Sequence, residues 1–156
     1  AVSLAHYLPL AQVFATDISR PALETARENA SRLQVKVEFL EGDLLSPFLD
    51  KEDHFDLIVA NLPYIPLEEY YTLDSGVKSY EPQLALLAPG DGFDIYRRLI
   101  PQAFTLLKEG AYLFIEIGWK QGEKALQMMN NFEDVQLIKD LAGYDRVVTA
   151  RKGSVR

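Results

Sequence analysis

The tetrapeptide Asn61-Leu62-Pro63-Tyr64 combines residue types that could grip a planar NH₂ group. An asparagine side chain offers an oxygen acceptor together with an amide donor. Pro63 has no N–H and favours an extended Leu62, so we expect the Leu62 carbonyl to point outward as a second acceptor. Tyr64 supplies a flat ring that could stack on the plane bearing the nitrogen. For an isolated Asn-x-Pro-Tyr, a turn that ends a strand is the simpler interpretation.

Two acidic positions could contact a nucleotide. Asp17 lies between a predicted strand and a predicted helix, where nucleotide-binding α/β folds use an acid to accept hydrogen bonds from ribose. It could equally cap that helix. Asp43 could accept the exocyclic amine of an adenine, with Leu44 against the ring. A simple Gly-Asp turn is the commoner explanation for that second position.

Apolar patterns predict the elements that carry these residues. Helices are expected at 19–33, where Ser19 caps the start, at 91–108, where Gly110 ends the helix, and at 120–131. Strands are expected at 12–18, 35–45, 55–64, 111–118, 133–140 and 146–152. Their alternation predicts an α/β fold with a mostly parallel, Rossmann-like sheet. The last two strands are expected to pair antiparallel, because their connection is too short for a parallel crossover.

Polar residues recur where these strands end. Ligands of open α/β sheets bind beyond the carboxyl ends of the strands. The residues at or just beyond such ends are Asp17, Asp43, Asn61, Glu116 and Asp140. Asn61 also follows a nearly continuous apolar run, typical of a strand covered on both faces. This position favours a binding role for Asn61–Tyr64 over a simple turn.

The stretch 65–91 is predicted to be a long irregular loop, ordered as a lid, which carries Glu81 and Pro82. Trp119 is expected to pack against the sheet. Neither His6 nor His54 has ligand-spaced partners, so no metal site is expected.

The composition narrows the class of partner. The 156 residues include 16 Lys and Arg against 23 Asp and Glu, a net charge of −7. This balance argues against a broad phosphate-binding surface, so nucleic acid is an improbable direct substrate. The chain has no cysteine, which suits a reducing cytoplasm. Residues 1–15 are apolar but interrupted, lack a basic leader and are too short for a bilayer span, so neither a targeting segment nor a membrane span is expected.

Several motifs together resemble one family. In chain order they are "RPALETARENA", "EFLEGD", "FDLIVANLPYIP", "YEPQLALLAPGDGFDIYRRLI", "LKEGAYLFIEIG", "QG" and "DLAGYDRVV". They resemble the catalytic domain of bacterial release factor glutamine methyltransferases, the S-adenosylmethionine-dependent protein N5-glutamine methyltransferases of the HemK family. Asn-x-Pro-Tyr alone marks a wider group that methylates amino nitrogens of adenine, cytosine or glutamine. The other motifs are more specific.

The resemblance implies a Rossmann-like methyltransferase fold and a role for each matching residue. Asp17 would bind the ribose of S-adenosylmethionine, Asp43 or Leu44 would border its adenine, and Asn61 would also contact the cofactor. The implied substrate is the glutamine of the Gly-Gly-Gln motif in peptide chain release factors. The implied substrate-binding residues are Asn61, Leu62, Pro63, Tyr64, Glu81 and Pro82, and the first four are also the implied catalytic residues.

The chain departs from this family in two ways. The usual motif is Asn-Pro-Pro-Tyr, and Leu62 replaces its first proline. Adenine dimethylases of ribosomal RNA often carry Asn-Leu-Pro-Tyr, so adenine N6-methylation of RNA or DNA is the alternative activity. The chain also lacks a GxGxxG turn. Residues 1–156 are therefore expected to be a catalytic-domain fragment without the N-terminal helical domain, the first strand and its glycine-rich loop, and an inactive fragment is a third interpretation.

Overall fold

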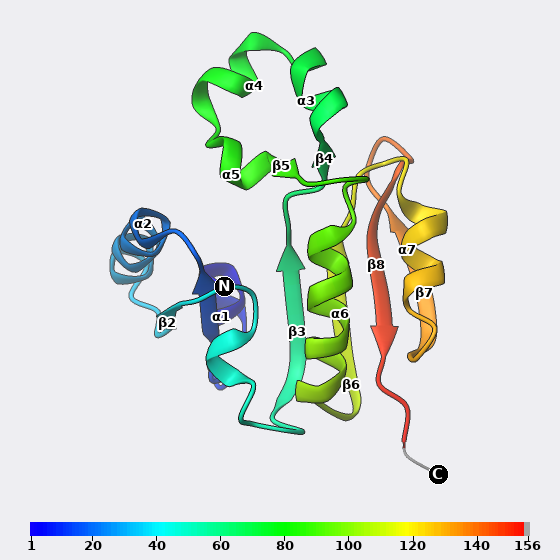
Figure 1. Cartoon of the computed structure of the whole chain (residues 1–156). Coiled ribbons are helices and arrows are strands. Elements are labelled where there is room, and N and C mark those ends of the chain that lie inside the picture. Colours follow the sequence, from blue (N-terminus) through cyan, green and yellow to red (C-terminus); the bar gives the residue numbers. More distant parts are fainter. Residues whose placement is uncertain (155–156) are drawn as a thin grey trace. The chain divides into compact units, whose positions relative to one another are not determined.

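The computed structural model describes residues 1–154 and divides the chain into two compact units, Ala1–Asp50 and Lys51–Arg156. Figure 1 colours the first unit from blue to cyan and the second from cyan to red. Each unit is described by itself below.

The first unit is a short parallel β-sheet with its helices. Its elements are α1 (Val2–Tyr7), β1 (Phe14–Asp17), α2 (Arg20–Arg32), β2 (Glu38–Glu41) and the 3₁₀ turn η1 (Ser46–Phe48). Strands β1 and β2 pair in parallel, with Asp17 opposite Glu41. The predicted cap of α2 is confirmed, because the Ser19 side chain accepts a hydrogen bond from the Ala22 N–H at 3.3 Å. The alternation predicted for this part of the chain is therefore correct, although both strands are shorter than expected.

The second unit contains a four-stranded mixed sheet. Its main elements are β3 (Phe55–Asn61), α6 (Asp94–Leu106), β6 (Leu107–Glu116), α7 (Gly122–Met128), β7 (Glu133–Lys139) and β8 (Asp145–Arg151). The strand order is β3-β6-β8-β7. Strands β3 and β6 are parallel, whereas β8 is antiparallel to both of its neighbours. This confirms the predicted parallel pairing that ends in an antiparallel hairpin.

Helix α6 covers one face of this sheet (Figure 1). Its predicted apolar stripe is buried, as are the facing strand residues. The buried set includes Tyr96, Leu99, Ile100, Ala103, Leu113, Ile115 and Val148. Burial of this kind is worth roughly 1.5–3 kcal/mol for each large apolar side chain, so the α6 stripe anchors the helix to the sheet.

Two predictions about this unit are wrong at the level of single residues. Helix α6 ends at Leu106, and Gly110 lies inside β6 at φ +78° rather than ending the helix. Leu107 is fully buried in the strand, as it would be in a longer helix, so the apolar period did not reveal that the chain switches from helix to strand at this residue. Strand β3 was also expected to be covered on both faces, but Ile58 is buried whereas Val59, on the opposite face, is 55 % exposed.

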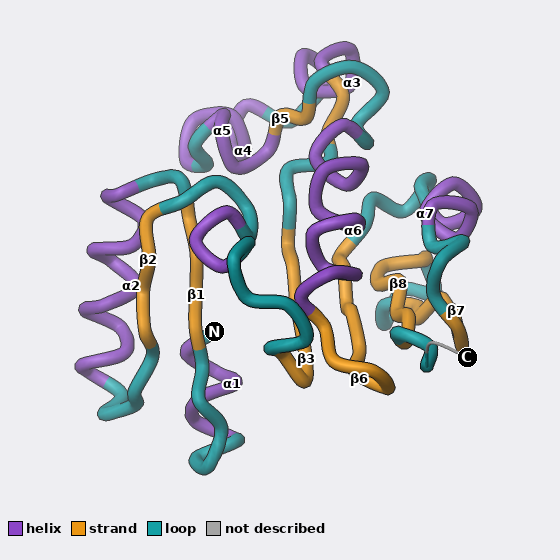
Figure 2. The backbone as a smooth tube through the Cα atoms, turned by 60° about the horizontal axis from the view of Figure 1, so that its bottom comes forward, coloured by secondary structure: helices purple, strands orange, loops and turns teal. Residues whose placement is uncertain are grey.

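The stretch 65–91 is regular rather than irregular, which corrects a third prediction. It contains β4 (Ile65–Pro66), α3 (Leu67–Thr72), α4 (Ser75–Tyr80), α5 (Gln83–Leu86) and β5 (Leu87–Ala88). Strands β4 and β5 pair in parallel and close the base of this excursion (Figure 2). Helices of four to six residues are too short to show a clear apolar period, which is why the sequence pattern missed them.

Candidate active site

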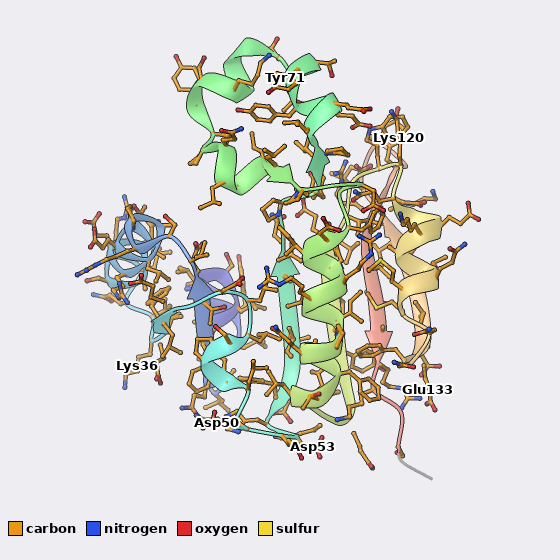
Figure 3. All side chains as sticks on the ribbon, viewed as in Figure 1. Lys36, Asp50, Asp53, Tyr71, Lys120 and Glu133 are labelled. Atoms are coloured by element: carbon orange, nitrogen blue, oxygen red, sulfur yellow. The ribbon has the colours of Figure 1, made fainter. Side chains whose placement is uncertain are left out.

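The carboxyl edge of the four-stranded sheet gathers three of the predicted polar residues. The register places Asn61 opposite Glu116, Glu116 opposite Val147, and Val147 opposite Ile138. Asp140 follows β7 at the same edge. Figure 3 shows Lys120 at this end of the unit and Asp53 at the opposite end. The second unit therefore has a polar edge where an α/β fold is expected to bind its ligand.

Asn61 is the last residue of β3 and is exposed. Within residues 1–154, no other group hydrogen-bonds to its side-chain amide, and none donates to the Leu62 carbonyl oxygen. Two acceptor oxygens at successive residues are thus available to a ligand. This is the pair that the tetrapeptide was predicted to offer.

The Tyr64 backbone is hydrogen-bonded by a buried glutamine, Gln121. Gln121 is only 9 % exposed. Its Nε2 donates to the Tyr64 carbonyl at 3.1 Å, and its Oε1 accepts from the Gly118 N–H at 2.8 Å. Both ends of the amide are engaged, so this buried polar group carries no unmet hydrogen-bonding need.

Two glycines allow Tyr64 to lie this close to its neighbours. A Cβ on Gly92 would lie 2.8 Å from the Tyr64 carbonyl oxygen, and Gly92 has φ +82°. A Cβ on Gly118 would lie 3.2 Å from the Tyr64 ring atom Cδ2 and 3.1 Å from Gln121 Oε1. Larger residues at these positions would push Tyr64 out of its place.

Arg146 meets the hydroxyl end of Tyr64. Its Nη1 donates to the Ile117 carbonyl at 3.3 Å and lies 3.5 Å from the Tyr64 hydroxyl oxygen. Its Nη2 and Nε donate to Asp140 Oδ2 at 3.1 and 3.3 Å. Burial opposes the charge of Arg146, but the bond to Asp140 and the nearby Tyr64 and Glu116 together outweigh that effect and raise the pKa of the guanidinium. Arg146 is therefore a fixed cation.

Asp140 is itself fixed by the turn that follows it. Its Oδ1 accepts from the N–H groups of Ala142 and Tyr144, both at 3.0 Å. The Tyr144 N–H, and then the Arg146 guanidinium, hold the pKa of the Asp140 carboxyl below its usual range. The "DLAGYDR" motif thus builds a rigid turn that orients Arg146.

The "DGFDIYR" motif has a structural role at the start of α6. Asp91 accepts two hydrogen bonds from Arg97, at 3.0 and 2.7 Å, and pairs with Lys124 of α7. The bonds from Arg97 and Lys124 lower the pKa of Asp91. Tyr96 donates from its hydroxyl to the Glu116 carbonyl at 3.0 Å, and burial raises its pKa well above that of a free tyrosine. These contacts tie α6 to α7 and to the carboxyl end of β6.

Three of the residues predicted to bind the cofactor, Asp17, Asp43 and Leu44, lie in the first unit, at the carboxyl ends of β1 and β2, whereas Asn61 lies in the second unit. The Thr16 hydroxyl donates to the Leu44 carbonyl at 2.7 Å, and the Gly42 N–H donates to the Asp17 carbonyl at 3.1 Å. Asp17, Asp43 and Leu44 are thereby brought to one edge. Asp17 is exposed, and its Oδ1 accepts from the Ser19 N–H at 2.7 Å.

A groove of about 550 Å³ also lies in the first unit, bordered by Asp17 and Thr16 and by residues of α1 and α2. Asp17 is an exposed carboxylate at a strand end, which is the kind of acceptor that ribose hydroxyls need. The residues of this edge therefore suit a nucleoside.

Glu81 and Pro82 connect α4 to α5 and are exposed. In the described part of the chain, neither makes a hydrogen bond or ion pair with residues 61–64. Their substrate-binding role stays a prediction. Trp119 corrects an expectation, because it is 53 % exposed and its ring lies 5.6 Å from that of Tyr144 instead of packing on the sheet.

Among residues 1–154, no three His, Cys, Asp or Glu side chains are grouped so that they could hold a metal ion. No helix in the same residues has the length and apolar character needed to cross a bilayer.

The sequence is similar to known methyltransferases. The family described as "Methyltransferase domain" matches residues 1–76. Release factor glutamine methyltransferase of Moorella thermoacetica is 44 % identical over 155 residues, which cover 96 % of this chain and 54 % of that protein. The enzymes of the same name from Geobacter sulfurreducens and Lactococcus lactis are 41 % and 38 % identical, over 98 % and 97 % of the chain. The chain spans about half the length of the curated relatives it matches.

Solved structures agree on the fold. Ribosomal protein L11 methylase from Lactobacillus delbrueckii matches with a TM-score of 0.59 and 25 % identity, over 92 % of this chain and 58 % of that one. A methyltransferase from Pyrococcus furiosus matches with a TM-score of 0.66 and 17 % identity, over 97 % and 68 %. The chain therefore has the Rossmann-like fold of S-adenosylmethionine-dependent methyltransferases, and its predicted resemblance to release factor glutamine methyltransferases is confirmed over nearly its whole length.

Proposed function

We propose that this chain carries the substrate clamp of an S-adenosylmethionine-dependent methyltransferase that acts on a glutamine side chain. The proposed substrate is the glutamine of the Gly-Gly-Gln motif in peptide chain release factors, methylated on its amide nitrogen in the cytoplasm. The supporting observation is the pair of available acceptors, the Asn61 side-chain oxygen and the Leu62 carbonyl, placed beside an anchored Tyr64. The names of the similar proteins agree with this substrate.

An amide nitrogen is a poor nucleophile because its lone pair is delocalised into the carbonyl, so its methylation depends on precise orientation, which the clamp provides. In the proposed mechanism, Asn61 Oδ1 and the Leu62 carbonyl oxygen each accept one N–H of the glutamine amide. Two fixed acceptors orient the nitrogen for attack at about 3–3.5 Å. Tyr64 stacks on the amide plane and excludes water. Asn61 and Tyr64 need not act as a strong base, because the amide nitrogen becomes cationic when it takes up the methyl group and then readily releases one of its N–H protons to give the neutral N-methyl amide.

S-adenosylmethionine supplies, when bound, an electrophilic methyl group on a positively charged sulfonium. Asp17 would hold its ribose, and Asp43, Leu44 and Asn61 would border the rest of the molecule. These residues fit the group, since Asp17, Asp43 and Leu44 share one strand edge and Asp17 is exposed.

The role of Asn61 is tested by Asn61→Ala in the complete protein, with the exposed Asn130→Ala as the matched control. Transfer of radiolabelled methyl from S-adenosylmethionine to a release factor is measured at saturating substrate. Loss of one orienting acceptor is expected to lower kcat by about 100-fold, while Asn130→Ala retains normal transfer. Wild-type kcat in Asn61→Ala would show that the side chain does not hold the amide.

The same assay distinguishes the alternative substrate class. Leu62 resembles the adenine-methylating version of the motif, and an adenine would enter the clamp only if extruded from its stack. The net charge of −7 favours a protein over a polyanion. We expect label in the release factor and none in ribosomal RNA offered at equal concentration.

A further inference from the structure

We propose that Gln121 and Arg146 are positioning residues for the methyl-transfer reaction and fix the two ends of Tyr64. Gln121 orients its backbone, and Arg146 orients its hydroxyl. The proposal rests on the proposed function of Asn61–Tyr64 as the amide clamp. It gives a role to the "QG" and "DLAGYDR" motifs, which the clamp itself does not explain.

Gln121 joins two segments that are distant in sequence. Its Nε2 reaches Tyr64, 57 residues earlier, at 3.1 Å, and its Oε1 binds the Gly118 N–H at 2.8 Å. The side chain is 9 % exposed, so water competes little for these bonds. A buried amide satisfied at both ends specifies one arrangement of the segments it connects. The turn after β6 therefore sets where the Tyr64 carbonyl lies.

Independent evidence comes from the two glycines around Tyr64. A Cβ on Gly92 would lie 2.8 Å from the Tyr64 carbonyl oxygen, and a Cβ on Gly118 would lie 3.2 Å from the Tyr64 ring, so both backbones lie close against Tyr64. Tyr64 therefore lies against the turn after β6, the segment just before α6 and Arg146 of β8. Such close approach limits the alternative positions of its backbone.

Arg146 controls the other end of the ring. Its guanidinium is held by Asp140 at 3.1 and 3.3 Å and by the Ile117 carbonyl at 3.3 Å. With its plane fixed in this way, Nη1 lies 3.5 Å from the Tyr64 hydroxyl. The ring direction is therefore set by a group whose own orientation is determined elsewhere.

The position of the Tyr64 backbone determines where the Leu62 carbonyl oxygen lies. Only Pro63 separates Tyr64 from Leu62, and the proline ring locks φ at that residue. A shift of the Tyr64 backbone is consequently transmitted to the Leu62 carbonyl, the second acceptor of the clamp. Within residues 1–154, neither the Gln121 nor the Arg146 side chain hydrogen-bonds to Asn61, so we expect both to act on substrate orientation through Tyr64.

The first test compares Gln121→Met with Gln127→Met in the complete protein. Both substitutions remove a glutamine amide, but Gln127 is exposed on α7. We expect Gln121→Met to lower kcat by at least tenfold with unchanged affinity for S-adenosylhomocysteine, and Gln127→Met to match wild type. In ¹³C-tyrosine spectra, the Tyr64 signal, assigned with Tyr64→Phe, is expected to move only in Gln121→Met.

A second pair keeps the proposal testable if Gln121→Met fails to fold. Arg146→Lys retains the charge but loses the fork that binds Asp140 and reaches Tyr64, whereas Arg151→Lys makes the same change elsewhere on β8. We expect the Tyr64 signal to move, and kcat to fall, in Arg146→Lys alone. An unmoved Tyr64 signal in both Gln121→Met and Arg146→Lys would overturn the proposal. If the wild-type protein methylates no glutamine, the function has failed, yet the spectra still decide whether these residues position Tyr64.

Discussion

At the scale of single residues, the candidate site combines polar atoms that are free to hydrogen-bond with a ligand and polar atoms that already hydrogen-bond within the protein. The Asn61 amide and the Leu62 carbonyl have no hydrogen-bonding partner within residues 1–154, whereas the Tyr64 backbone is bound by Gln121. This contrast separates contact groups from supporting groups. It explains how a flat ring and two acceptors could present one constant geometry to an amide.

A pair of substitutions separates the ring of Tyr64 from its hydroxyl. Tyr64→Phe keeps the stacking surface and loses only the contact to Arg146, and because that contact is long, at 3.5 Å, kcat is expected to fall by less than about tenfold. Tyr64→Ala removes the ring and is expected to lower kcat by about 100-fold through loss of orientation. Steady-state methyl transfer measures both, and equal losses would mean that the ring itself contributes nothing.

The glycines near Tyr64 give a stability prediction. Gly92→Ala meets both a positive φ and the Tyr64 carbonyl, whereas Gly110→Ala has a similar φ of +78° with no neighbour within 4 Å. The left-handed conformation costs either alanine roughly 1–2 kcal/mol. Gly92→Ala should lose roughly 1–3 kcal/mol more through overpacking. Urea denaturation checks the difference, and equal free energies of unfolding would disprove the close approach.

At the scale of elements, α6 is tied to β6 through the hydroxyl of Tyr96. Burial raises the pKa of this tyrosine, so the folded state keeps the proton that the unfolded chain releases near pH 10. The fold should therefore lose stability as the pH rises above about 10, and Tyr96→Phe should remove that part of the loss. Urea denaturation from pH 8 to 11 measures it. A pH dependence identical in Tyr96→Phe would exclude this source.

The sequence predicted those elements whose local pattern is sufficient. Ser19 capped the helix as expected, the α6 stripe was buried, and Asn61 ended its strand at the edge where ligands bind. The apolar pattern failed at Leu107, because this residue would be buried whether it belonged to a longer α6 or to β6. It also failed in 67–86, because helices shorter than two turns show no clear apolar period.

The support of Tyr64 could not be predicted from local sequence. Gln121 and Arg146 lie 57 and 82 residues away along the chain, so their contacts exist only in the folded sheet. A glutamine three residues after a glycine carries no signal of burial. Only their place within family-like motifs distinguished these two residues.

At the scale of the whole molecule, the chain corresponds to about half the length of its relatives. Its first unit carries the candidate cofactor residues Asp17, Asp43 and Leu44, and its second carries the proposed amide clamp. The inactive-fragment interpretation is tested by calorimetry with S-adenosylhomocysteine on residues 1–156 and on the complete protein. We expect micromolar binding by the complete protein and weaker binding by residues 1–156, which lack a glycine-rich turn. Equal affinities would show that the cofactor needs no residues beyond these 156.

The central claim is that the clamp holds a glutamine amide, and one measurement tests it most directly. The complete protein is incubated with S-adenosylmethionine and a release factor, and the product is digested and sequenced by mass spectrometry. The account predicts a single added methyl group on the side chain of the Gly-Gly-Gln glutamine, absent with Asn61→Ala. A methyl group on any other residue, or on ribosomal RNA in place of the release factor, would contradict it.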